Sequence, residues 1–413
     1  MLDEKIRESI SNKVISRKLG VFENLKYFTD IVEYEWLANY LMSQISCYCF
    51  KLRKIILKIP MESVLGNSDK SKAEVLQLLN KKIPVYRQAY SDRTAWLMAC
   101  LSELAYLRFN PLFSNDDAKD YLLDSMSRMI DDKKRNSFLK LIDIFGYDHK
   151  EELKKLESEV SNLQFNLIET YDEGGTQAIL LSNDKFLVLA FRGTEGTSIK
   201  DIKADAKAHT MNCESGGKIH SGFSAAYDQV ALDINERLKD PSIAHLPLFI
   251  TGHSLGGALA TVAAKKLSPQ AGIAACYTFG SPRVGDEQWI SQIKTPIYRL
   301  VNAADCVTML PPGDETVSLF AWLFQFIPAC GSSIRKWLLA NLDGYLHGGN
   351  MRYLTNCKKD AYAQTKLLYS VSFWYRMKGF FLKKMPWKVF LSDHSISVYR
   401  KKLWVLAHRN NVN

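Results

Sequence analysis

Short apolar runs alternate with amphipathic stretches in the second half of the chain. Three apolar runs have the length of buried strands, and they lie at residues 248–251, 274–279 and 296–301. Three stretches with helical character separate them or flank them, at residues 224–238, 257–267 and 284–293. Strands that alternate with helices predict an α/β fold with a mainly parallel sheet covered on both faces.

An antiparallel hairpin is predicted upstream of these runs. Residues 177–181 and 185–191 are rich in apolar side chains, and the polar residues 182–184 between them are typical of a turn. We expect this hairpin to extend one side of the sheet.

The first part of the chain has helical periodicity and few turn signals. Residues 1–83 predict a helical N-terminal extension that ends before Pro84, and residues 84–413 predict the α/β domain. Further helices are expected at 94–106 and within 116–161. The extension is interpreted as a helical cap or a partner-binding segment.

The composition is that of a globular protein, with 47% hydrophobic and 24% charged residues among 413. No stretch is long and apolar enough for a membrane-spanning helix, and the first residues do not resemble a secretory signal. We therefore expect a cytoplasmic or peripheral membrane protein, or one exported by a specialised route. The eight cysteines are scattered and lack metal-ligand spacing, which gives no indication of a cysteine metal site.

The net charge of +10 is concentrated near the C-terminus. Residues 366–413 hold ten basic residues and one acidic residue, which makes the rest of the chain nearly neutral. Aromatic and basic side chains interleave at 373–388, a mixture that suits an anionic membrane surface. A solvated basic face is the alternative interpretation. No nucleic-acid recognition motif is present, so a nucleic-acid partner is not expected.

A candidate nucleophile follows the first parallel strand. The segment Gly252-His253-Ser254-Leu255-Gly256 lies between an apolar run and an alanine-rich helical stretch. Strand, Gly-x-Ser-x-Gly and helix in this order describe a nucleophile elbow, which projects the serine hydroxyl out of the sheet. His253 precedes the serine, so its ring should point away from the hydroxyl and serve a structural purpose.

Candidate partners for the serine lie further along the chain. Asp305 follows the predicted strand 296–301, at the sheet edge where α/β enzymes place site residues. Three histidines come after it. His408 lies among polar residues near the terminus and is expected to be solvated, whereas His347 and His394 are both candidates for the base. Their spacing alone does not separate them.

Five motifs in order give the chain a resemblance to the class 3 lipases, a family of α/β-hydrolases. They are Phe-Arg-Gly-Thr at 191–194, Ile-His-Ser-Gly-Phe at 219–223, Gly-His-Ser-Leu-Gly-Gly at 252–257, Thr-Phe-Gly-Ser-Pro-Arg-Val-Gly at 278–285 and the segment ending in Leu-Pro-Pro at 299–312. The resemblance covers roughly residues 172–400.

The resemblance implies a role for each candidate. Ser254 would be the nucleophile and Asp305 the carboxylate that orients the base. The base would be His394, with His347 as the runner-up. The backbone N–H groups of Thr194 and Leu255 would form the oxyanion hole.

Two segments depart from the family pattern. The expected lid position, residues 198–209, has only a narrow apolar stripe, which favours an esterase or phospholipase over a strongly interface-activated lipase. An insertion at about 313–344 contains an apolar piece, 317–328, that is too short to cross a bilayer. This piece is interpreted either as an interfacial helix or lid, or as part of a buried helical hairpin. We predict peripheral membrane contact through 317–328 and 373–388.

The sequence thus predicts a lipid carboxylic-ester hydrolase, similar to a lipase or phospholipase A1, that works through an acyl-enzyme. Its substrate would be a lipid ester, and this reaction needs neither a metal nor an organic cofactor. Two alternatives remain: a catalytically inactive membrane-docking protein, and an acyltransferase that uses the same acyl-enzyme.

Overall fold

The computed structural model describes the parts of the chain that surround the predicted nucleophile. These parts are residues 63, 69–80, 89–107, 109, 149–193, 210–311, 344–357, 361–372, 374–376 and 392–409. The predicted lid at 198–209, most of the insertion at 313–344 and the piece at 317–328 lie outside them.

Two compact units make up the chain. One comprises Met1–Ser63 and Leu107–Leu156, and the other comprises Val64–Tyr106 and Glu157–Asn413. Helix α7 (His149–Asn162) begins in the first unit and ends in the second. All other elements described below belong to the second unit. The proposed division between an extension over 1–83 and a domain over 84–413 stays a prediction.

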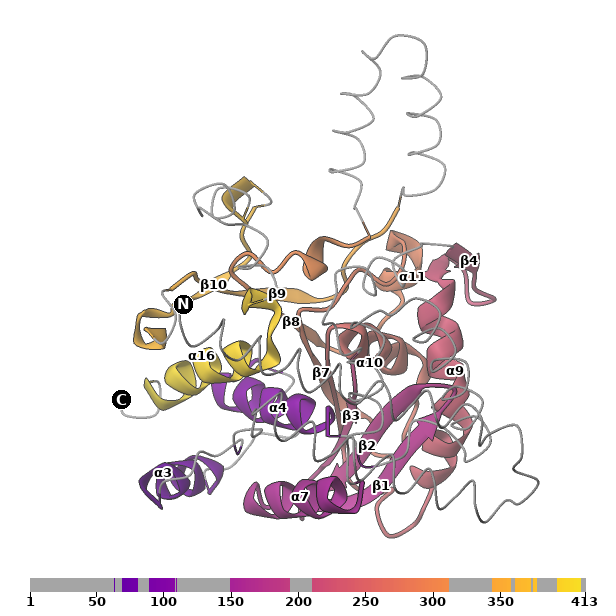
Figure 1. Cartoon of the computed structure of the whole chain (residues 1–413). Coiled ribbons are helices and arrows are strands. Elements are labelled where there is room, and N and C mark those ends of the chain that lie inside the picture. Colours follow the sequence, from indigo (N-terminus) through magenta and orange to yellow (C-terminus); the bar gives the residue numbers. More distant parts are fainter. Residues whose placement is uncertain are drawn as a thin grey trace, which may run out of the picture. The chain divides into compact units, whose positions relative to one another are not determined.

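An eight-stranded sheet forms the centre of the second unit (Figure 1). Its strand order is β1-β2-β3-β6-β7-β8-β9-β10. The pairs from β3 to β9 are parallel, whereas β1, β2 and β3 form an antiparallel meander and β10 runs antiparallel to β9. The strands are β1 (Asn166–Glu173), β2 (Thr176–Ser182), β3 (Leu187–Phe191), β6 (Leu248–His253), β7 (Ile273–Phe279), β8 (Ile297–Asn302), β9 (Asn350–Leu354) and β10 (Leu367–Tyr369).

Helices and a small second sheet accompany these strands. The helices are α3 (Asp69–Leu79), α4 (Asp92–Leu104), α9 (Ser221–Arg237), α10 (Leu255–Lys266), α11 (Glu287–Ser291) and α16 (Ile396–Arg409), with short 3₁₀ turns at Val307–Met309 and Tyr362–Gln364. The second sheet pairs β4 (Thr210–Asn212) with β5 (Lys218–His220).

Side chains of β6 show how the sheet is covered. Successive side chains of a strand point to opposite faces. Leu248 and Ile250 join the core cluster formed with α9 and α10. The hydroxyl of Thr251 contacts the opposite layer, because it lies 2.9 Å from the Ser102 hydroxyl of α4. The sheet is therefore buried on both faces, which explains why its central strands are continuous apolar runs.

Helix α16 reaches the sheet by packing against α4. The rings of Trp96 and Trp404 lie 5.1 Å apart between centroids, and Arg400 pairs with Glu103. These contacts place the start of the C-terminal helix close to the end of β6.

The α/β fold with its mainly parallel sheet is confirmed, and the remaining differences are local. The predicted hairpin, the three parallel strands and the helix at 94–106 are present within a few residues. The predicted helix at 284–293 was wrong at its start, because Gly285 forms bridges to Ile219 and Leu346 and α11 begins only after Asp286. Strands β1, β9 and β10 were not predicted.

None of the helices described by the structure combines the length and the apolar character that a membrane span requires.

The hydroxyl pair between α4 and β6 generates a stability prediction. Thr251 donates to the Tyr277 carbonyl oxygen at 2.9 Å, so Ser102 donates to Thr251, and both side chains are fully buried. Thr251→Val leaves the Ser102 hydroxyl buried without its acceptor, and we expect a loss of about 1–3 kcal/mol in the free energy of unfolding. Urea denaturation measures it.

The double variant Ser102→Ala/Thr251→Val provides the control for this pair. Because it removes both hydroxyls, it should be more stable than Thr251→Val alone. Additive losses in the double-mutant cycle would show that the two hydroxyls do not interact.

Candidate active site

Ser254 occupies a strained turn between β6 and α10. Its φ of 58° and ψ of −127° lie in a region that residues other than glycine rarely adopt. The turn is close-packed: a Cβ at Gly252 would lie 2.1 Å from the Gly256 carbonyl oxygen, and one at Gly256 would lie 2.3 Å from the Phe191 carbonyl oxygen. Only glycine fits at these two positions, which gives the spacing of the predicted elbow its physical reason.

His394 connects the serine to a buried carboxylate. Its Nε2 atom lies 2.9 Å from the Ser254 Oγ, and its Nδ1 lies 2.9 Å and 3.0 Å from the two carboxylate oxygens of Asp305. The Ser254 side chain is nearly buried, and Asp305 is completely buried. A carboxylate accepts only, so Nδ1 carries the proton and Nε2 faces the hydroxyl as an acceptor.

Further donors hold the Asp305 carboxylate. The Tyr399 hydroxyl donates to Oδ2 at 2.7 Å, and the backbone N–H of Val307 donates to Oδ1 at 3.0 Å. Burial, followed by the charge of Asp305, raises the pKa of Tyr399 well above its ordinary value. Tyr399 therefore remains protonated as a donor, and the carboxylate is fully hydrogen-bonded in a site without water contact.

The loop that carries His394 is tied to the end of β8. The side-chain amide of Asn302 donates to the Asp393 carbonyl oxygen at 2.7 Å. The backbone N–H of Ala304 donates to the Asp393 carboxylate at 3.1 Å. Lys402 in turn donates to the Asn302 side-chain oxygen at 2.6 Å. These bonds fix the backbone immediately before His394 against the segment that carries Asp305.

His253 positions the same loop from the other side. Its Nε2 lies 2.6 Å from the carbonyl oxygen of His394 and must donate to it, so Nδ1 accepts from the Tyr106 hydroxyl at 2.7 Å. Burial, together with the proximity of His394, keeps the pKa of His253 well below its ordinary value. A neutral ring fits this pattern of one donor and one acceptor. His253 thus has a specific structural role: it connects Tyr106, which follows α4, to the His394 backbone.

The predicted oxyanion donors lie beside the nucleophile as far as the structure describes them. Leu255 is the first residue of α10, so its N–H has no partner within the helix. Thr194 lies outside the described residues. Its neighbour Gly193 approaches the site closely, because a Cβ there would lie 2.4 Å from the His253 carbonyl oxygen and 3.2 Å from the Ser254 Cβ.

His347, the runner-up base, lies in a different environment. Its Nε2 donates to the Thr308 carbonyl oxygen at 2.6 Å, and the side chain is partly buried. Burial, followed by the charges of Arg299 and Arg283, keeps its pKa well below the ordinary value. The geometry brings His394, rather than His347, to Ser254 and Asp305.

Sequence reasoning missed two tyrosines of this site. Tyr399 lies on α16 five residues after His394, and Tyr106 follows the end of α4. Neither belongs to a motif with recognisable spacing. The available signal was weak: both aromatics occur near the ends of apolar helical stretches, where most tyrosines serve only in packing.

The mainly parallel sheet and the turn with Ser254 between β6 and α10 are those of the α/β-hydrolase fold. Residues 188–315 match the family model described as Lipase (class 3). This match confirms the resemblance to the class 3 lipases that was inferred from the motifs.

Individual relatives align over the same part of the chain. A secreted mono- and diacylglycerol lipase of Fusarium solani is 38% identical over 134 residues, covering 31% of this chain and 40% of that protein. A lipase of Rhizomucor miehei is 33% identical over 32% of this chain and 39% of that protein. The chloroplastic phospholipase A(1) DAD1 of Arabidopsis thaliana is 30% identical over 30% of this chain and 33% of that protein.

The matches are partial. They span 33% to 40% of the lengths of these relatives. Among solved structures, a triacylglycerol lipase with a serine protease triad is 21% identical, covers 69% of this chain and 86% of that chain, and has a TM-score of 0.42.

The partly buried His347 generates a prediction for the pH dependence of stability. Its pKa is lowered in the folded protein, whereas the unfolded chain takes up a proton below about pH 6.5. Stability should therefore be present above that pH and fall as the pH drops below it, by up to about 1.4 kcal/mol per pH unit for this group. His347→Gln should reduce the slope by this amount.

Chemical denaturation measures how the free energy of unfolding changes with pH. A range from about pH 5 to about pH 7.5 brackets the ordinary histidine pKa of about 6.5. The exposed His245, changed to Gln, is the matched control and should leave the slope as it is in the unmodified protein. Equal slopes for His347→Gln and the unmodified protein would contradict the prediction.

Proposed function

We propose that this protein hydrolyses carboxylic esters of lipids, with Ser254, His394 and Asp305 as its catalytic triad. The observation that carries the proposal is the continuous chain from the Ser254 hydroxyl through the His394 ring to the Asp305 carboxylate, with both steps at 2.9 Å. A serine, a base and an orienting acid at hydrogen-bond distance are what acyl transfer through a serine requires.

The proposed reaction begins with the attack of Ser254 on the ester carbonyl. His394 accepts the serine proton at Nε2 and passes it to the leaving alcohol, while Asp305 stabilises the imidazolium that forms. Water then attacks the acyl-enzyme with His394 again as the base. The product is a free fatty acid, and the Ser254 hydroxyl is restored.

Backbone donors stabilise the charge that develops on the carbonyl oxygen in this proposal. The N–H of Leu255 is available at the start of α10, where the helix dipole also favours negative charge. Thr194 is proposed as the second donor, and the close approach of Gly193 to Ser254 supports it. One such donor typically contributes about 3 kcal/mol to transition-state stabilisation.

The matched relatives support lipids as the substrate class. Their names include a mono- and diacylglycerol lipase and a phospholipase A(1), so the shared segment occurs in enzymes for neutral and polar lipid esters. We therefore propose a lipid ester as the substrate of this chain.

Contact with the lipid surface is proposed for the aromatic segment 373–388. Trp374 and Tyr375 expose 66% and 51% of their surface, whereas the neighbouring Arg376 is buried and donates to the Asp305 carbonyl oxygen at 3.2 Å. Exposed aromatics thus sit next to a residue that holds the triad loop. Tryptophan and tyrosine favour the headgroup region of a bilayer, so this position would bring the site to its substrate.

Removal of the nucleophile tests the proposed reaction. Ser254→Ala should abolish turnover of p-nitrophenyl esters, triacylglycerol emulsions and phospholipid vesicles, because no acyl-enzyme can form. Ser291→Ala, which changes an exposed serine on α11, should retain full activity.

Asp305→Asn in the same assay separates the triad from a lone reactive serine. It should lower kcat by about 10³–10⁴-fold, because the His394 tautomer is no longer fixed. Residual turnover in Ser254→Ala equal to that of the unmodified protein would refute the proposal. Lipid binding without any turnover by the unmodified protein would favour a docking protein instead.

The aromatic pair generates a separate prediction about interfaces. Trp374→Ala/Tyr375→Ala should lower turnover of vesicles and emulsions several-fold while leaving turnover of soluble short-chain esters unchanged. Leu232→Ala removes another exposed apolar side chain, which lies on α9, and serves as the control. A parallel loss on soluble and insoluble substrates would mean that the pair supports the fold rather than the interface.

A further inference from the structure

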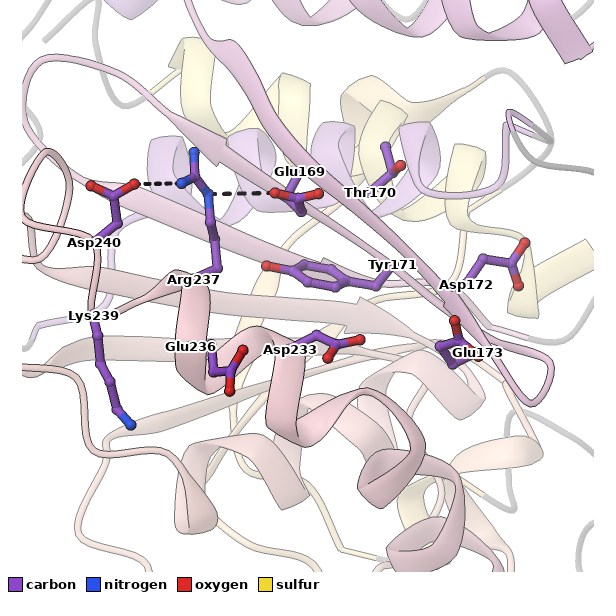
Figure 2. A pocket seen from close by; sticks show the side chains of 10 residues that line it. All are labelled: Glu169, Thr170, Tyr171, Asp172, Glu173, Asp233, Glu236, Arg237, Lys239 and Asp240. Atoms are coloured by element: carbon purple, nitrogen blue, oxygen red, sulfur yellow. Dashed lines mark hydrogen bonds and ion pairs between the residues drawn. The ribbon is translucent and has the colours of Figure 1, made fainter.

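A second concave site lies between the edge strand β1 and the C-terminal end of α9 (Figure 2). Its volume is about 630 Å³, which falls in the range of small-molecule sites. Ten residues line it: Glu169, Thr170, Tyr171, Asp172, Glu173, Asp233, Glu236, Arg237, Lys239 and Asp240. We call it the acidic groove, because six of these residues are acidic and two are basic.

Only part of this negative charge is neutralised inside the groove. Arg237 pairs with Glu169 at 3.4 Å and with Asp240 at 2.5 Å, and both pairs are drawn in Figure 2. Glu173, Asp233 and Glu236 are exposed, and the part of the chain that the structure describes offers them no cation within ion-pair distance. The groove therefore retains an uncompensated negative charge in a protein whose overall net charge is +10.

A buried tyrosine provides the second observation. Tyr171 is 5% exposed, and none of the residues that the structure describes forms a hydrogen bond with its hydroxyl. Figure 2 shows its ring extending from β1 along the groove, with the hydroxyl directed toward Arg237. A buried polar group without a partner costs stability, so its presence at a groove of carboxylates indicates an unfilled interaction there.

The carboxylates are arranged in two rows. Asp233 and Glu236 are three residues apart on α9, which places them on one helix face about 5–6 Å apart. Glu169 and Glu173 flank Tyr171 on the alternate positions of β1. Among the described residues, no group of three or more acids, histidines or cysteines is close enough to hold a metal ion. The spread of the charges suits an elongated ligand with several separated cationic groups.

From this arrangement we propose that the acidic groove binds a linear aliphatic polyamine. Its separated ammonium groups would pair with the exposed carboxylates of Glu173, Asp233 and Glu236. One of them would donate to the Tyr171 hydroxyl, which can accept a hydrogen bond. The site is distinct from Ser254, and the proposal does not depend on ester hydrolysis.

An alternative explanation for the carboxylates on β1 is that they protect the edge of the sheet. Carboxylates on β1 would prevent pairing with a second sheet. That function requires neither the carboxylates of α9 nor a buried tyrosine hydroxyl, so it leaves half of the groove unexplained.

Titration calorimetry with spermine tests the proposal on the full chain. The unmodified protein should bind with a stoichiometry of one, and Glu173→Gln/Asp233→Asn/Glu236→Gln should bind at least about ten-fold more weakly, because each exposed ion pair contributes a factor of about two to five. The control Asp184→Asn/Glu214→Gln removes two exposed acids outside the groove and should leave the affinity unchanged.

Tyr171→Phe separates ligand binding from folding. The loss of a partnerless hydroxyl should leave Tm unchanged or raise it, whereas spermine affinity should fall about two- to five-fold. Equal affinity in the groove variant and the unmodified protein would overturn the proposal. Competition by Mg²⁺ at the same concentration as spermine would also overturn it, because this would indicate general charge screening. The Ser254→Ala protein should bind spermine as the unmodified protein does.

Discussion

The architecture of the site depends on one completely buried carboxylate. Asp305 lies beneath the surface with no exposed area, and a buried charge without partners destabilises a fold by several kcal/mol. Its oxygens accept from His394, Tyr399 and the Val307 N–H, which come from the C-terminal loop, α16 and the turn after β8. The requirement to satisfy this single charge thus brings three separate segments to one point, and the position of His394 follows from it.

The nucleophile is held by a different kind of constraint. Ser254 has a strained backbone conformation, which the surrounding packing maintains. Glycines allow β6 and α10 to pack closely, and both faces of the sheet are covered. The Ser254 hydroxyl therefore has little freedom to move relative to the sheet. Hydrogen bonds hold His394 beside Ser254, and one example is the bond from His253 to the His394 carbonyl oxygen. For the proposed reaction, a rigid Ser254 and a tethered His394 would provide the preorganised geometry that electrostatic catalysis needs.

The sequence allowed the centre of the fold to be predicted, but not its margins. Runs such as 248–251 are continuous and apolar because both sheet faces are buried there, so they are easy to recognise. Strand β1 was missed because it lies at the sheet edge, where polar and apolar side chains mix, and β10 has only three residues. Motif order predicted Ser254, Asp305 and His394, which lie within hydrogen-bond distance of one another in a chain. Spacing alone could not separate His394 from His347, because the choice depends on how α16 packs, which is a long-range property of the fold.

The position of the base in the chain has a consequence for biosynthesis. The contact between His394 and Ser254 joins residues 140 positions apart, and α16 packs on α4, which precedes the whole sheet. A ribosome therefore completes the sheet and the elbow well before it adds the histidine. During synthesis Ser254 therefore lacks its contact with His394 until α16 has been made and has packed on α4. In the proposed mechanism, this order would delay ester hydrolysis until the sheet and α16 are both in place.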